Sequence, residues 1–144
     1  EKVTETKSSV FYKDFAHAPS KLRATTAALK EQFPDRELIA CMELHTFSSL
    51  NKQFLPQYKD TMEKADRALI YFSPEVVAHK RLEALSENEV KAAFGGENVE
   101  VFTDSTELIA ELKRIDWNGK NLLMMSSGNF DGVDFPDLAE KIFI

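Results

Sequence analysis

The sequence predicts an α/β fold: a three-layer, Rossmann-like domain with a mainly parallel sheet of about five or six strands flanked by helices. Short runs of β-branched and aromatic residues alternate with amphipathic helical patterns, which is typical of βαβ units with right-handed crossovers. Two of the runs, 38–42 and 122–125, are continuously apolar, as expected of central strands covered on both faces. The chain of 144 residues has the length of one such domain.

The strands are expected in the runs richest in β-branched and aromatic residues. These runs cover residues 9–14, 37–43, 68–72, 99–103 and 121–126. Residues 1–7 are polar and without periodicity, and we expect them to be the remainder of an interdomain linker, with the domain itself at residues 8–144. The first residue is Glu1 rather than a methionine, which also favours a piece of a longer protein.

Helical spacing of apolar residues predicts the first two helices and the last one. Residues 20–33 form the first helix, before a Pro-Asp pair that ends it. An apolar stripe that includes Tyr58 predicts a second helix over residues 49–64, where Pro56 is tolerable only within the first turns. The last helix is expected over residues 135–142.

Capping residues predict the other two helices. Residues 86–94 carry Ser86 and, three positions later, Glu89, which is the spacing of a capping box, and a glycine pair follows them. A fourth helix then begins at a cap formed by Asp104 or Ser105.

Composition excludes several classes of function. The formal net charge of −6, without a basic stripe, argues against nucleic-acid binding. No apolar stretch approaches the length of about eighteen residues that a membrane span needs. The single cysteine, Cys41, is expected to be buried, and the lack of a second cysteine suits the reducing cytoplasm. The three histidines are scattered through the sequence and form no ligand cluster, so no metal site is predicted. We expect His79 at the surface and Trp117 as a partly buried anchor.

The first candidate site follows the first predicted strand. Asp14 ends that strand, and His17 lies just before the helix that Pro19 opens. The carboxyl ends of strands line the ligand crevice of open α/β sheets, and a helix N-terminus favours phosphate. The spacing alone equally allows a structural interpretation, in which Asp14 caps the helix and His17 fills a turn.

The six residues from Asp14 to Pro19 read Asp-Phe-Ala-His-Ala-Pro. This string resembles the signature that opens the C-terminal domain of the Mur ligase family, the ATP-dependent ligases that build the peptide stem of bacterial cell-wall precursors. The resemblance covers nearly the whole chain, residues 10–143. It implies that Asp14 binds the ribose hydroxyls of ATP and that His17 lies near the phosphates.

A second polar group follows the second predicted strand. By resemblance, Glu43 matches the tripeptide-adding members of the family and His45 the alanine-adding members, while two arginines of the family pattern are missing. We expect His45 and Ser48 to bind the amine substrate, with His45 close to His17 in space. The alternative for His45 is a loop histidine without a ligand.

A third polar group, Ser-Ser-Gly-Asn-Phe-Asp-Gly at residues 126–132, follows the last predicted strand. Its small residues let the backbone approach a ligand, and either of its glycines can adopt a positive φ. The string resembles the tail of the murein tripeptide ligases more than that of the alanine-adding enzymes. We therefore expect Ser127, Asn129 and Asp131 to bind the amine substrate; the alternative is an ordinary turn between strand and helix.

The resemblance implies that other domains of the enzyme, outside this chain, carry part of its binding sites. The chain has no phosphate-binding Gly-rich loop followed by Lys and Ser or Thr. In the family a central domain carries that loop and holds most of ATP and Mg²⁺, and an N-terminal domain binds the UDP-sugar. The full enzyme would join L-alanyl-γ-D-glutamyl-meso-diaminopimelate or L-alanine to UDP-N-acetylmuramate, while this chain would supply no catalytic residue and be inactive alone. The alternative is a freestanding nucleotide-binding or docking module without ligase activity.

Overall fold

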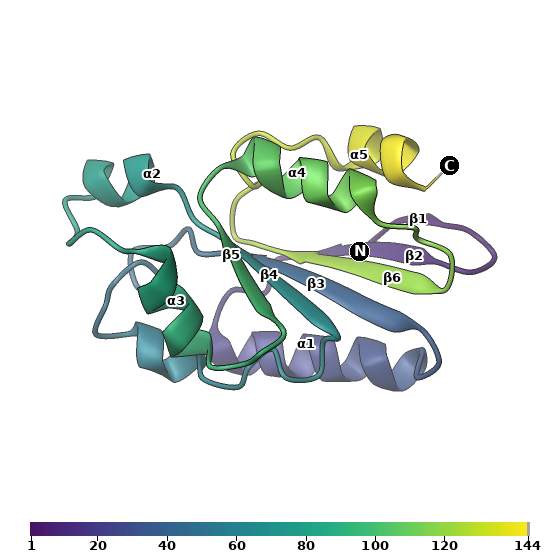
Figure 1. Ribbon diagram of the computed structural model, residues 1–144, viewed down its shortest axis with the longest axis horizontal. Coiled ribbons are helices and arrows are strands. Elements are labelled where there is room, and N and C mark those ends of the chain that lie inside the picture. Colours follow the sequence, from purple (N-terminus) through teal and green to yellow (C-terminus); the bar gives the residue numbers. More distant parts are fainter. Residues whose placement is uncertain (144) are drawn as a thin grey trace.

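A six-stranded sheet divides the molecule into three layers in the computed structural model, which describes residues 1–143 (Figure 1). The strand order is β1-β2-β6-β3-β4-β5, and every neighbouring pair is parallel except β1 with β2. The predicted fold class is therefore confirmed. The strands are β1 (Lys2–Glu5), β2 (Val10–Asp14), β3 (Glu37–Glu43), β4 (Arg67–Tyr71), β5 (Val99–Phe102) and β6 (Lys120–Met125).

Helices cover both faces of the sheet. Figure 1 shows α1 and α3 on one face, with α4 and α5 on the other. The elements are α1 (Pro19–Gln32), the 3-10 turn η1 (Leu55–Tyr58), α2 (Pro74–His79), α3 (Glu87–Phe94), α4 (Ser105–Arg114) and α5 (Phe135–Ile142).

The central strand β3 contributes to both halves of the core. Leu38, Ala40 and Met42 pack in the core on the α1 side, while Ile39 and Cys41 pack on the α4 and α5 side. This alternation follows from the two-residue period of a strand, and both faces are apolar because both are covered. Cys41 is fully buried, as predicted, and burial raises the pKa of its thiol.

The predicted caps are confirmed. Ser86 and Glu89 form both hydrogen bonds of a capping box at α3, and Gly95 ends that helix with a left-handed φ of 76°. Asp104 rather than Ser105 caps α4, because its carboxylate accepts from the backbone N–H of Thr106 at 2.9 Å.

The predicted helix over residues 49–64 is wrong. The segment instead forms turns around η1, and only Leu55–Tyr58 are helical. Pro56 stands in the first positions of η1, and Asp60 adopts a φ of 62°, which no α-helix can contain. Tyr58 and Met62 are nonetheless buried, so the apolar stripe marks residues of the core although the backbone is irregular.

Two elements of the structure have no counterpart in the prediction. Residues 2–5, expected within a linker, form the antiparallel edge strand β1, because pairing with β2 satisfies their backbone although their side chains are mostly polar. Helix α2 begins at Pro74 and is capped by Ser73, whose hydroxyl accepts from the N–H of Val76; the Ser-Pro pair at residues 73–74 is a recognisable start signal.

Candidate functional site

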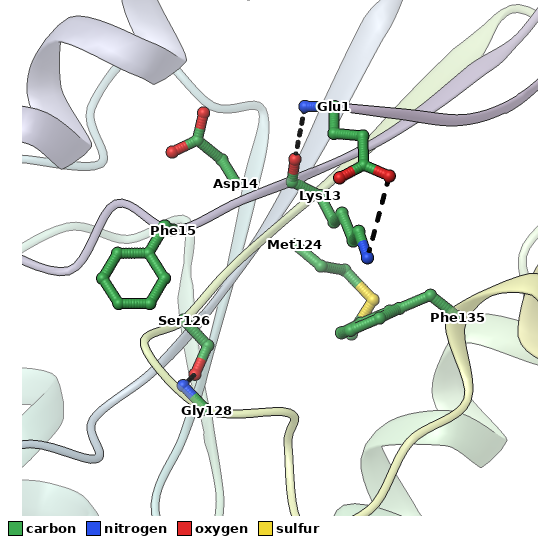
Figure 2. A pocket seen from close by; sticks show the side chains of 8 residues that line it. All are labelled: Glu1, Lys13, Asp14, Phe15, Met124, Ser126, Gly128 and Phe135. Carbon is green, nitrogen blue, oxygen red and sulfur yellow. Dashed lines mark hydrogen bonds and ion pairs between the residues drawn. The ribbon is translucent and has the colours of Figure 1, made fainter.

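A cleft of about 500 Å³ lies at the carboxyl ends of the neighbouring strands β2 and β6. After these strands the chain leaves toward opposite faces of the sheet, to α1 from β2 and to α5 from β6 (Figure 1). This is the topological switch point, where open α/β sheets bind ligands. We call it the switch-point cleft; it is lined by Glu1, Lys13, Asp14, Phe15, Met124, Ser126, Gly128 and Phe135 (Figure 2).

Asp14 is the last residue of β2 and is exposed at the edge of the switch-point cleft. One carboxylate oxygen, Oδ1, accepts from the N–H of Ala16 at 2.7 Å. The proposed helix-capping role is wrong, because the N-cap of α1 is Ala18, without a side-chain hydrogen bond. Figure 2 shows the Asp14 carboxylate and the Lys13 ammonium on opposite sides of β2, as strand alternation requires.

His17 lies in the turn between β2 and α1. Its Nδ1 lies 2.9 Å from the carbonyl oxygen of Phe15, which can only accept, so Nδ1 donates. Its ring meets that of Phe15 edge-on at a centroid distance of 5.4 Å. The backbone carbonyl of His17 accepts from the Tyr58 hydroxyl at 2.8 Å, so the turn is held from η1.

A second hollow, of about 540 Å³, lies at the N-terminus of α1. Asp14 and Phe15 line this hollow as well as the switch-point cleft, and Phe15 is 70% exposed between the two. No side chain caps α1; Pro19 has no N–H, and Lys21 and Leu22 donate theirs to the Ala18 carbonyl. The Ser20 N–H, the positive end of the helix dipole and the charge of Lys21 are therefore what this hollow offers to an anion.

The loops after β3 and β6 meet at the same edge of the sheet, as predicted. We call residues 44–49 the β3 loop and residues 126–132 the β6 loop. A methyl group on Gly128 would lie 3.1 Å from Cδ2 of His45, so the two loops are in close contact there. The His45 side chain is 42% exposed, and Ser48 is exposed. His17 follows β2 and His45 follows β3, and β6 lies between these two strands in the sheet. The expected closeness of His45 to His17 therefore stays a prediction.

The β6 loop has an unusual backbone. Phe130, Asp131 and Gly132 are consecutive residues with φ of 56°, 63° and 89°, so Gly132 is the glycine with a positive φ, while Gly128 serves close approach. Asn129 and Asp131 are exposed, and Ser127 is partly exposed. The side-chain oxygen of Asn129 accepts from the N–H of Gly132 at 2.9 Å, so this side chain also shapes the loop.

Two residues that the sequence did not predict to contact a ligand lie behind these loops. Glu43, the last residue of β3, is only 4% exposed and accepts from the Ser126 hydroxyl at 2.6 Å and the Phe130 N–H at 2.9 Å. Tyr71 is buried in contact with Phe130, and burial raises its pKa to about 12, with Asp131 adding to the shift. The position of Glu43, an acid that ends the apolar run of β3, could have indicated in the sequence that this residue belongs to the candidate site.

Other expectations concern single residues and absences. His79 is exposed and Trp117 is buried, with its indole N–H donating to the Leu112 carbonyl at 2.9 Å. Within residues 1–143, no three or more His, Cys, Asp or Glu side chains are grouped to hold a metal ion. In the same part of the chain, no helix is long and apolar enough to cross a membrane.

The fold and the switch-point cleft define the class: a three-layer α/β domain with a cleft at the carboxyl edge of a mainly parallel sheet. The chain matches the family described as "Mur ligase, glutamate ligase domain" over residues 1–128, and it belongs to this family. The resemblance predicted from residues 14–19 is therefore confirmed.

Individual relatives agree with this assignment. The UDP-N-acetylmuramate–L-alanine ligase of Lactobacillus acidophilus is 28% identical over 131 residues, which are 90% of this chain and 27% of that enzyme. A murein peptide ligase from Psychrobacter arcticus shares the fold with a TM-score of 0.71 at 18% identity, over 99% of this chain and 28% of that one. A domain assigned to a UDP-N-acetylmuramate:L-alanyl-γ-D-glutamyl-meso-diaminopimelate ligase from Haemophilus ducreyi has a TM-score of 0.62 at 22% identity, over 99% and 94% of the two chains. The chain thus spans about a quarter of the length of the enzyme from Lactobacillus.

Proposed function

We propose that this chain is the C-terminal domain of an ATP-dependent ligase that joins L-alanyl-γ-D-glutamyl-meso-diaminopimelate or L-alanine to UDP-N-acetylmuramate in peptidoglycan synthesis or recycling in the cytoplasm. One observation carries the proposal. The switch-point cleft has Asp14, the candidate nucleotide residue, at the end of β2, and the β6 loop, a candidate amine-binding segment, begins at its other side. Nucleotide and amine would therefore meet across a single cleft.

The nucleotide would bind on the α1 side of this cleft. The Asp14 carboxylate is exposed and keeps Oδ2 for the ribose hydroxyls, while Oδ1 also accepts from Ala16. The uncapped N-terminus of α1, with His17 and Lys21 beside it, offers the Ser20 N–H, the positive end of the helix dipole and the Lys21 charge to the phosphates. By the family resemblance, the central domain outside this chain would hold most of the Mg²⁺ contacts; within residues 1–143 no three or more His, Cys, Asp or Glu side chains are grouped for a metal ion.

The incoming amine would bind between the β3 and β6 loops. His45, Ser48, Ser127, Asn129 and Asp131 are polar and at least partly exposed there. Ligation requires transfer of the ATP γ-phosphate to a carboxylate, which releases ADP and forms an acyl phosphate. The amine then attacks the acyl carbon and displaces inorganic phosphate. Closure of this domain over ATP and the amine would exclude water and complete the site, and the UDP-sugar would come from the N-terminal domain.

Residues at the ends of β3 and β6 indicate which amine, tripeptide or alanine, the enzyme would prefer. The acid Glu43 and the Gly-containing β6 loop favour the tripeptide, whereas His45 and the Lactobacillus relative favour alanine. A tripeptide carries more carboxylates than alanine and needs more polar partners, which both loops supply. We therefore propose the tripeptide as the preferred amine.

An assay of the full-length protein that contains this chain tests the proposal. ADP release is measured with ATP, Mg²⁺ and UDP-N-acetylmuramate, with tripeptide and alanine in parallel. The proposal expects release that depends on UDP-N-acetylmuramate and is faster with tripeptide. A strong preference for alanine would reverse the branch and keep the family activity. No release with either amine would contradict ligase function and favour the alternative, a nucleotide-binding or docking module.

A further inference from the structure

We propose that Glu43 is a positioning residue that locks the β3 and β6 loops into one arrangement and thereby sets the geometry of amine binding. The consequence for the amine rests on the proposed function, while the locking itself does not. Neither the nucleotide residues nor the candidate amine contacts include Glu43. Its assignment comes from burial, hydrogen bonds and backbone conformation.

The carboxylate of Glu43 is hydrogen-bonded to the β6 loop. Its Oε1 accepts from the Ser126 hydroxyl at 2.6 Å and from the Phe130 N–H at 2.9 Å. The same Ser126 oxygen accepts from the Gly128 N–H at 2.7 Å, so one chain of hydrogen bonds runs from β3 through the loop. Glu43 is 4% exposed as a residue, and a buried carboxylate is unfavourable unless it is hydrogen-bonded, so the acid and these donors depend on one another.

The β6 loop needs such an anchor because of its backbone. Phe130 and Asp131 are non-glycine residues in the left-handed region, which side chains disfavour. The Phe130 ring is fully buried and stacks on Tyr71 at a centroid distance of 6.3 Å. Ring burial and the hydrogen bond to Glu43 together hold Phe130 in this conformation, and Asp131 is displayed at the surface as a result.

The other carboxylate oxygen faces the β3 loop. Glu43 Oε2 lies 3.7 Å from Nδ1 of His45. A Cβ on Gly128 would lie 3.2 Å from Glu43 Oε1 and 3.2 Å from His45 Nε2, so the three residues fill one space. Displacement of Glu43 would therefore move His45 and the β6 loop together, and these two loops carry all the candidate amine contacts.

Three variants of the full-length protein test the proposal. Glu43→Ala removes the acceptor. Glu43→Gln keeps one oxygen able to accept from Ser126 and Phe130, and so should restore the loop. Glu111→Ala is the control, because Glu111 is a partly buried acid that pairs with Arg67 and Arg114 outside both loops.

Kinetics and hydrogen exchange give separate readouts. In Glu43→Ala we expect the KM for the amine to rise about tenfold or more and that for ATP to stay within about twofold. Backbone exchange within residues 126–132 should become faster. Glu43→Gln should stay near the wild type in both readouts, and Glu111→Ala should leave both unchanged. If Glu43→Ala does not fold, Ser126→Ala removes one donor and is expected to show the same pattern more weakly.

Unchanged exchange within residues 126–132 in Glu43→Ala, or equal increases in the KM for ATP and for the amine, would overturn the positioning role. Faster exchange with an unchanged amine KM has a different meaning. It would uphold the locking of the loop by Glu43 and contradict the placement of the amine at these loops. The experiment thus separates a failure of this inference from a failure of the proposed function.

Discussion

The hydroxyl of Tyr58 donates a hydrogen bond to the backbone carbonyl of His17 at 2.8 Å, between residues 41 positions apart in the sequence. Tyr58 is itself fixed by burial and by stacking on Phe94, with ring centroids 5.1 Å apart. The turn that follows Asp14 and carries His17 is therefore held by η1. This contact links the core on the α1 side to the candidate nucleotide site.

The variant Tyr58→Phe tests this support. It removes one hydrogen bond, and we expect the free energy of unfolding to fall by about 1 kcal/mol. In the full-length protein the KM for ATP should rise by roughly a few fold, because the His17 turn loses an anchor. Denaturant unfolding and steady-state kinetics measure the two effects. A loss of stability with no change in the KM for ATP would show that η1 supports the core but not the nucleotide site.

Alkaline pH should destabilise the fold through two tyrosines. Burial raises the pKa of Tyr58 and of Tyr71 to about 12, whereas an unfolded chain has tyrosine pKa values of about 10. The folded state therefore holds these protons more tightly. Their contribution to stability is fully present below about pH 10 and is lost as the pH rises to about 12.

Unfolding free energies measured across this range, together with phenolate absorbance of the folded chain, check the prediction. Tyr58→Phe and Tyr71→Phe should each make the alkaline loss of stability less steep. Ionisation of both side chains near pH 10 in the folded protein, with stability unaffected, would be inconsistent with their burial.

Local signals in the sequence were sufficient for most of the fold. The apolar run of β3 and the capping box of Ser86 and Glu89 depend on neighbouring residues only, and both were predicted correctly. Strand β1 could not be predicted, because its pairing with β2 is a tertiary contact of a mostly polar segment. The helix predicted around η1 was wrong for a related reason. The apolar residues there have helical spacing, but the positive φ of Asp60 turns the backbone out of a helix.

The position of the candidate site in the fold could be predicted, its detailed geometry only in part. Strand ends place Asp14 and the two loops at one edge, and the sequence predicts this. The bond between Glu43 and Ser126 joins residues 83 positions apart, and no local pattern encodes it. The left-handed φ of Phe130 could not be predicted either, because residues other than glycine rarely adopt that conformation.

Gly128→Ala should disturb the contact between the β3 and β6 loops. The added methyl group would lie 3.1 Å from Cδ2 of His45, which can move, and 3.2 Å from Oε1 of Glu43, which is held by hydrogen bonds. We expect a stability loss of about 1 kcal/mol and an amine KM raised roughly tenfold by displacement of His45.

Gly119→Ala is the matched control, because Gly119 precedes the opposite end of β6, has a φ of 78° and has open space around its Cβ position. It should lower stability by about 1 kcal/mol through backbone strain and leave the amine KM unchanged. Equal effects of the two variants on the amine KM would contradict the local role of Gly128.

The chain alone should bind ATP weakly and release no ADP. It would supply ribose contacts and peripheral phosphate contacts, and it contains no Gly-rich phosphate loop with Lys and Ser or Thr. Calorimetric titration with ATP and an ADP-release assay with UDP-N-acetylmuramate and tripeptide check both parts. Turnover by the isolated chain would refute the assignment of catalysis to other domains.

The division of the cleft between nucleotide and amine is the central claim, and paired kinetics of Asp14→Ala and His45→Ala in the full-length protein test it most directly. Loss of the Asp14 acceptor should raise the KM for ATP by about ten- to a hundredfold and leave that for the amine nearly unchanged. His45→Ala should do the reverse. If Asp14→Ala left the KM for ATP unchanged, or if His45→Ala raised only that KM, the proposed division would be contradicted.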